Sequence, residues 1–191
     1  MRPWHGSGQP ATAAAPCRVN GTTMRRRGLA RIARIPMILC PYHIAPSRIP
    51  GAGKGLYIDR PAQAGSILVA PDAINRTYAF EEISADPKLS SLLHTSVRWF
   101  GDHYTLSPDW PDECFVNHSF EPTGLWHLGF IFANDELSVG TELTVDYRHL
   151  LAPGQVEEFR DARTGEPIVG FSWEESIRNS TSRLSALLAA P

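Results

Sequence analysis

The chain has 191 residues, 42% of them hydrophobic, and a formal net charge of −2; this length supports one buried core and therefore a single small domain. Its cysteines, Cys17, Cys40 and Cys114, form no CxxC pair or Cys/His cluster, which argues against a metal site or a disulfide framework. No apolar run approaches the roughly 18 residues of a membrane span, so we expect a soluble protein of the reducing cytoplasm that binds no membrane.

Residues 1–36 form a basic leader, rich in Ala, Gly, Pro and Thr, with seven arginines and no acidic residue. Such a segment buries too little apolar surface to fold alone. Three interpretations are open: a disordered arm, a targeting peptide, or sequence upstream of a true start at Met24 or Met37. We favour the first and third, because the apolar stretch Ile35–Cys40 is too short and too interrupted by proline for a signal peptide.

From Met37 onward, short apolar runs alternate with Gly and Pro, which predicts a mostly β fold with a few short helices. We expect a main domain over residues 37–154, and a C-terminal connector and helix over residues 155–191. Helices are predicted at Pro87–Trp99 and Ser172–Ala189. Strands are predicted at Gly55–Ile58, Ser66–Val69, Tyr104–Leu106, Trp126–Asn134 and Glu142–Val145.

The body of the chain, residues 37–191, is acidic. Removing the seven leader arginines from the 18 basic residues leaves 11 against 20 acidic ones, a net charge of about −9. Two interpretations are open here as well. The charge either steers a basic, lysine-bearing substrate towards the protein or simply keeps a small protein in solution.

Three segments carry the functional signal, and each is weak alone. The first, Gly51–Tyr57, is a glycine-containing turn that enters a strand. The second is Phe115–Pro122, which contains Asn117-His118-Ser119, and the third is Gly140–Tyr147. Together and in this order they resemble the signatures of the SET-domain protein lysine methyltransferases.

This resemblance implies a β-clip architecture, in which small curved sheets surround a pseudoknot-like crossing. It also implies that S-adenosylmethionine and a peptide lysine enter from opposite faces. By the same resemblance Tyr147 is the catalytic residue that orients the amine. The residues expected to bind the cofactor are Gly53, Lys54, Gly55, Leu56, Asn117 and His118.

Methyl transfer requires a neutral amine, yet a free lysine has a pKa of about 10.4, so its neutralisation at pH 7 costs roughly 4 to 5 kcal/mol. A dry, aromatic channel lowers this cost because it disfavours the ammonium form. Each aromatic candidate, taken singly, fits a plain core role better, and only the resemblance favours the channel. The expected channel residues are Trp99, Phe100, Tyr104, Trp126 and Val145.

The chain departs from the family pattern at Phe120, at Thr123, which replaces a frequent Asn, and at Val69–Asp72, whereas the tail with Trp173 resembles zinc-free relatives. Phe120 replaces a cysteine that shares a zinc ion with a cysteine-rich tail in many relatives, and the tail here has no cysteine, so the resemblance implies a compact, zinc-free branch. Val69–Asp72 stands where many relatives carry tyrosine with Gly-Glu, which changes one channel wall. Trp173 either covers the adenine, as in zinc-free relatives, or fastens the C-terminal helix to the core.

The sequence therefore predicts an S-adenosylmethionine-dependent protein lysine methyltransferase whose partner is a protein with a lysine in a basic segment. An alternative is a SET-like interaction module without turnover, since a fold does not fix a function. A third hypothesis, nucleic-acid binding through the basic leader, is the weakest, because the body is acidic.

Overall fold

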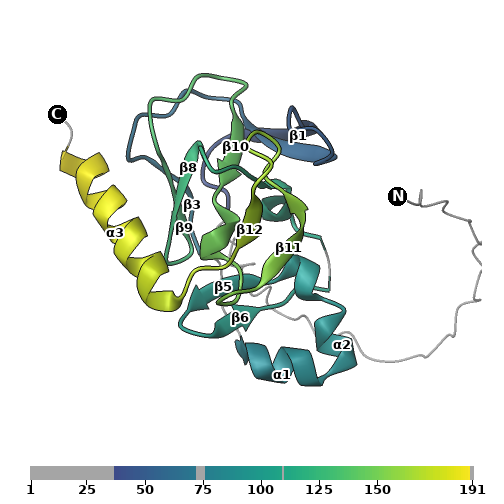
Figure 1. Cartoon of the computed structure of the whole chain (residues 1–191). Helices are drawn as coiled ribbons and strands as arrows, with labels where there is room; N and C mark the ends of the chain where they lie inside the picture. The colour runs from purple at the N-terminus through teal and green to yellow at the C-terminus, as the bar shows by residue number, and fades with distance from the viewer. Residues whose placement is uncertain (1–36, 72–75, 109, 190–191) are drawn as a thin grey trace, which may run out of the picture. The chain divides into compact units, whose positions relative to one another are not determined.

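The computed structural model describes residues 37–71, 76–108 and 110–189 (Figure 1). The predicted basic leader, residues 1–36, lies outside this part of the chain. The described residues form twelve short strands in four small sheets, together with three α-helices and three 3-10 turns. The prediction of a mostly β fold with short helices is therefore confirmed.

The largest sheet brings together distant parts of the sequence in the order β1-β2-β10-β7. Strands β1 (Tyr42–Pro46) and β2 (Lys54–Ile58) form an antiparallel hairpin, and β10 (Glu142–Val145) pairs antiparallel with β2. On its other side β10 pairs in parallel with β7 (Asn117–His118). Every residue of β10 is buried, as expected for a strand that has neighbours on both sides.

A second sheet has the order β3-β9-β8, from Ile67–Val69, Phe130–Ala133 and Gly124–His127. The predicted single strand Trp126–Asn134 is instead a hairpin that turns at Leu128 and Gly129, which have φ values of 50° and 85°. Gly129 is required twice over, because a Cβ at this position would also overlap the Trp99 ring.

The third sheet has the order β4-β6-β5, from Tyr78–Ala79, His103–Thr105 and Val97–Phe100. The predicted helix Pro87–Trp99 is wrong in its second half. The chain forms α1 (Phe80–Ala85), α2 (Pro87–Ser90) and η1 (Leu93–Thr95), and then enters β5. Strand β5 follows because its β-branched and aromatic residues, Val97 and Trp99 among them, favour an extended backbone that pairs with β6.

The C-terminal part contains η2 (Asp112–Phe115), η3 (Tyr147–His149), the hairpin β11 (Val156–Arg160) and β12 (Pro167–Val169), and α3 (Trp173–Ala189). The helix predicted at Ser172–Ala189 is confirmed, whereas the expected polar connector is the β11-β12 hairpin. Helix α3 runs alongside β8 (Figure 1).

The main core lies between the first two sheets and is built from aliphatic residues of β2, β3, β9 and β10. Its fully buried members include Leu56, Ile58 and Leu143. A smaller core, around Ile83 and Tyr104, joins α1 to the third sheet. Within the described ranges, no helix is both long and apolar enough to cross a membrane.

Candidate functional site

A cavity of about 610 Å³ lies where the three signature segments meet. Its walls come from the turn before β2, from β5 and β6, from the β8-β9 hairpin, from the end of η2 with β7, from the end of β10 with η3, and from β11. The cavity collects most of the predicted site residues: Lys54, Trp99, Tyr104, Asn117, His118, Trp126, Val145 and Tyr147.

Two hydrogen bonds hold Tyr147, the second residue after β10. Its hydroxyl donates a hydrogen bond to the Val116 carbonyl at 2.9 Å, and its backbone N–H donates to Nδ1 of His118 at 3.1 Å. Asp146 caps the η3 turn that begins at Tyr147 by accepting from the Arg148 N–H. Burial, helped by the negative charge of Glu157, raises the pKa of the Tyr147 phenol. The phenol is therefore fixed in place and stays protonated at neutral pH.

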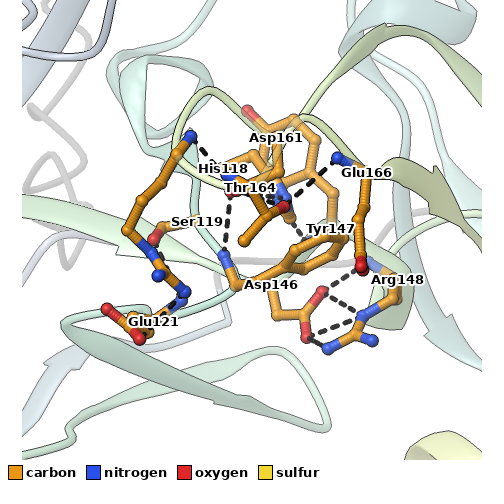
Figure 2. A network of polar contacts seen from close by, with 11 residues as sticks. His118, Ser119, Glu121, Asp146, Tyr147, Arg148, Asp161, Thr164 and Glu166 are labelled. Atoms are coloured by element: carbon orange, nitrogen blue, oxygen red, sulfur yellow. Dashed lines mark hydrogen bonds and ion pairs between the residues drawn. The ribbon is translucent and has the colours of Figure 1, made fainter.

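His118 lies at the centre of the polar network in Figure 2, and only 6% of its surface is exposed. Because its Nδ1 accepts the Tyr147 N–H, the proton of the neutral ring is on Nε2. Nε2 lies 3.6 Å from Oδ2 of Asp161 and makes no hydrogen bond within the described residues. Burial lowers the pKa of His118, although Asp146 and Asp161 oppose the shift, so the ring stays neutral at pH 7.

Asp161 connects the β11-β12 hairpin to the His118 segment (Figure 2). One carboxylate oxygen accepts from the Thr164 N–H and hydroxyl, at 2.7 and 2.8 Å, while the other accepts from the Phe120 N–H at 3.3 Å. Burial alone would raise the pKa of this carboxyl, but these hydrogen bonds and nearby His118 outweigh it and hold the pKa low. The hairpin turn is thus docked onto the second signature segment by an ionised side chain.

Asn117 takes a more limited role than the sequence suggested. Its side-chain amide donates to the Lys54 carbonyl at 2.8 Å and to Oε1 of Glu142 at 3.1 Å. Both N–H groups are therefore engaged within the fold, and the amide oxygen is the atom left for a ligand. A ligand contact at Asn117 would have to come from a hydrogen-bond donor, such as the ammonium group of an amino acid.

Glu142 organises the turn beside the cavity and was not predicted as part of the site. In addition to Asn117, its carboxylate accepts from the Ser47 hydroxyl at 2.5 Å, the Arg48 N–H at 2.9 Å and the Tyr57 hydroxyl at 3.0 Å. Burial opposes ionisation, yet these hydrogen bonds hold the Glu142 pKa below its usual value. One buried carboxylate therefore fixes β1, β2 and β7 relative to β10.

The glycine-rich turn contributes differently from expectation. The residues that line the cavity are Ile49, Pro50, Gly51 and Ala52, together with Lys54, whereas Gly53, Gly55 and Leu56 do not. Leu56 is completely buried in the main core. Gly55 is needed for packing, because a Cβ there would overlap the Glu142 carboxylate.

Three of the four aromatic channel candidates line the cavity, and the fourth does not. Trp99 and Trp126 line the cavity with ring centroids 6.2 Å apart, and the Trp99 indole donates to the Thr105 hydroxyl at 2.7 Å. Tyr104 also lines it, and its buried hydroxyl has no hydrogen-bond partner among the described residues. Phe100 does not line it; this side chain is exposed and lies against His103.

Trp173, the remaining cofactor candidate, does not line the cavity either. It begins α3, and its ring lies 5.6 Å from the guanidinium of Arg98. Arg98 is buried and donates to the carbonyls of Gly101, Leu151 and Phe171. The structure therefore agrees with the second interpretation of Trp173, in which it fastens the helix to the body.

In place of α3, the β11 strand forms the wall beside Tyr147, through Glu157 and Phe159 among others. Sequence reasoning took this stretch for a connector. The available signal was the pair of short runs Val156–Arg160 and Pro167–Val169, separated by a short polar segment that contains Gly165. The described residues contain no group of three or more His, Cys, Asp or Glu side chains that could hold a metal ion.

The sequence matches no protein-family model and no curated protein. The function must therefore be argued from the site itself.

Proposed function

We propose that the protein is an S-adenosylmethionine-dependent methyltransferase that transfers a methyl group to the side-chain amine of a protein lysine. The observation that carries the proposal is the meeting of the three signature segments in one cavity. Lys54, Asn117, His118 and Tyr147 are up to 93 positions apart in the sequence yet share its wall. A chance set of short matches has no reason to converge in this way.

The proposal includes the SET-domain architecture. Four small sheets and the parallel pairing of β7 with β10 support it. That pairing runs the His118 segment beside the strand that ends at Tyr147, so the second and third signatures become neighbours. Ser119 extends the contact, since its N–H donates to the Val145 carbonyl at 3.1 Å.

The residues present are compatible with the proposed cofactor, which supplies a methyl group on a sulfonium sulfur. A volume of about 610 Å³ lies within the range of small-molecule sites. The Asn117 amide oxygen suits an ammonium group, and the buried Nε2–H of His118 is a donor without a partner in the described chain. We propose that these two residues, with Lys54 and the turn Ile49–Ala52, hold the cofactor.

The chain's own groups fit an amine substrate. The Tyr147 phenol remains neutral, and because its hydrogen is donated to Val116, its oxygen is free to accept a hydrogen bond from an amine. Indole rings from Trp99 and Trp126 line the cavity and favour the neutral amine over the ammonium. An aligned and dehydrated amine is what an in-line displacement at carbon requires.

The proposal is tested by isothermal titration with S-adenosylmethionine and by labelled-methyl transfer to proteins of a cell lysate. We expect binding by the wild type and by Tyr147→Phe, with labelling reduced on the order of a hundredfold in the variant because the amine is no longer oriented. Tyr78→Phe, on β4 and away from the cavity, is the matched control and should label like the wild type. Absence of both binding and Tyr147-dependent labelling would replace the enzyme with the interaction module.

A further inference from the structure

Glu157 places a carboxylate on the wall of the same cavity. Gln155, Glu157, Phe159, Arg160 and Ala162 of this stretch line the cavity, while Glu158 does not and is exposed. The Glu157 side chain is half-buried. Its carboxylate accepts from the Glu158 N–H, but among the described residues it has no ion-pair partner. A half-buried carboxylate without a cationic partner is uncommon, because burial of a charge is costly unless the charge is paired.

The cations of the cavity wall make other contacts. The Lys54 ammonium lies over the Phe115 ring, 5.7 Å from its centroid, and the Arg160 guanidinium donates to the Gly165 carbonyl at 3.1 Å. Neither forms an ion pair with Glu157. The Glu157 charge instead acts on Tyr147, whose pKa it helps to raise, so the carboxylate is within electrostatic reach of the phenol. A cationic group on the substrate would supply the ion-pair partner that Glu157 lacks among the described residues.

We propose that Glu157 binds the substrate's alkylammonium group and accepts the proton that this group must lose. The inference rests on the proposed function and names its substrate form, a protonated primary amine. The ammonium first donates a charge-assisted hydrogen bond to the carboxylate. One N–H bond then breaks, its electron pair stays on nitrogen as the lone pair, and an O–H bond forms on Glu157. The products are a neutral amine beside Tyr147 and a neutral carboxylic acid.

Proton acceptance is the role that suits this position. A permanently ionised carboxylate would stabilise the ammonium and so oppose methyl transfer, whereas a carboxylate that takes the proton removes both charges from the cavity. Burial raises the pKa of Glu157, with Glu158's charge adding to the shift and its backbone N–H opposing it. The raised pKa makes Glu157 a better proton acceptor than a solvated glutamate.

The first test uses n-butylamine as the probe and the fluorescence of the cavity tryptophans as the signal, at pH 7.5. We expect saturable binding to the wild type and roughly tenfold or weaker binding to Glu157→Gln, as for the loss of a hydrogen bond to a charged group. Glu158→Gln, one residue away on the exposed face, should bind like the wild type. Uncharged n-butanol should not distinguish the three proteins. No butylamine binding by the wild type, or equal binding by both glutamine variants, overturns the inference.

The second test detects the transferred proton directly. Infrared difference spectra on butylamine binding should show the C=O stretch of a protonated carboxyl group in the wild type and lose it in Glu157→Gln. Its absence in the wild type rules out proton acceptance. In the methyl-transfer assay, the Glu157→Gln rate should rise towards the wild-type rate as the pH approaches about 10.4, where the amine is neutral without help; a merely structural role would show no such recovery.

These tests separate the inference from the proposed function. If S-adenosylmethionine does not bind while butylamine binds in a Glu157-dependent way, the methyltransferase proposal fails and the amine site stands. If the cofactor binds and labelling depends on Tyr147 but not on Glu157, the enzyme stands and the role of Glu157 fails.

Discussion

The Tyr147 hydroxyl donates a hydrogen bond to the Val116 carbonyl at 2.9 Å, so the residue expected to act on substrate also fastens the end of β10 to the segment before β7. This double role sets a first prediction about stability. Tyr147→Phe should lower the free energy of unfolding by about 1 kcal/mol, the net contribution of one hydrogen bond.

Urea denaturation followed by circular dichroism measures this change. Tyr78→Phe, at a half-buried tyrosine with no hydrogen bond among the described residues, is the control and should change little. A loss of several kcal/mol in Tyr147→Phe would mean that the variant misfolds, and its activity loss could then not be assigned to catalysis.

The Glu142 carboxylate sets the second prediction, because it serves four donors with only 8% of the residue exposed. Glu142→Ala leaves the Ser47 hydroxyl, the Arg48 N–H and one Asn117 N–H without their acceptor, whereas the Tyr57 hydroxyl keeps the Pro46 carbonyl at 2.8 Å. We expect a loss of about 3 kcal/mol or more, since each buried unsatisfied group costs roughly 1 to 3 kcal/mol. The measurement is again urea denaturation, with Glu136→Ala, at an exposed glutamate, as the control. Equal stability of the two variants would contradict the role given to Glu142.

These two residues show how far sequence reasoning reaches. Tyr147 was identified because it lies in a short signature whose meaning comes from resemblance. Glu142 lies in the same signature, yet nothing near it in the sequence indicates that its partners are Ser47, Arg48, Tyr57 and Asn117, which lie far away along the chain. A local pattern specifies which face of a strand is buried, but not which distant donors meet there.

The same limit explains the errors. The spacing of Leu89, Leu92 and Leu93 is helical, but it could not show that Val97 and Trp99 would find a strand partner in β6. For Trp173 the sequence left two roles open, and the structure places its ring 5.6 Å from the guanidinium of the buried Arg98, as expected for a residue that fastens α3 to the body. The strands β2 and β10 and the helix α3 were predicted well, since their own apolar patterns define them.

Gly55 sets the third prediction. Its φ is not positive, so the glycine is required by the nearby Glu142 carboxylate rather than by backbone strain. Gly55→Ala should destabilise the protein, and the cost should shrink by about 1 kcal/mol or more when Glu142→Ala removes the obstructing group. A double-mutant cycle in urea measures this coupling. Additive costs would show that Gly55 is needed for another reason.

The fourth prediction concerns two buried serine–histidine contacts that join α3 to the rest of the domain. Ser176 and Ser180 are the buried residues of the helix, and their hydroxyls meet Nδ1 of His149 and His127 at 2.8 and 2.9 Å. Burial lowers the pKa of His149 to about 4, with the Asp146 charge opposing the shift and nearby arginines, Arg148 first, adding to it.

The pH dependence of the free energy of unfolding follows from the difference between the folded and unfolded pKa of His149. The unfolded pKa of histidine is about 6.5 and the folded pKa is lower, so the unfolded state binds the proton first as the pH falls. The contribution of neutral His149 to the free energy of unfolding is fully present above about pH 6.5 and is lost as the pH falls towards 4, by roughly 3 kcal/mol in total.

His149→Gln should remove most of this His149-dependent loss between pH 6.5 and 4.5, because glutamine keeps a polar group beside Ser176 but does not titrate. Urea midpoints across this range are the measurement, and His43→Gln, at a more exposed histidine, should retain the full slope. An unchanged slope in His149→Gln would place the acid sensitivity at other groups.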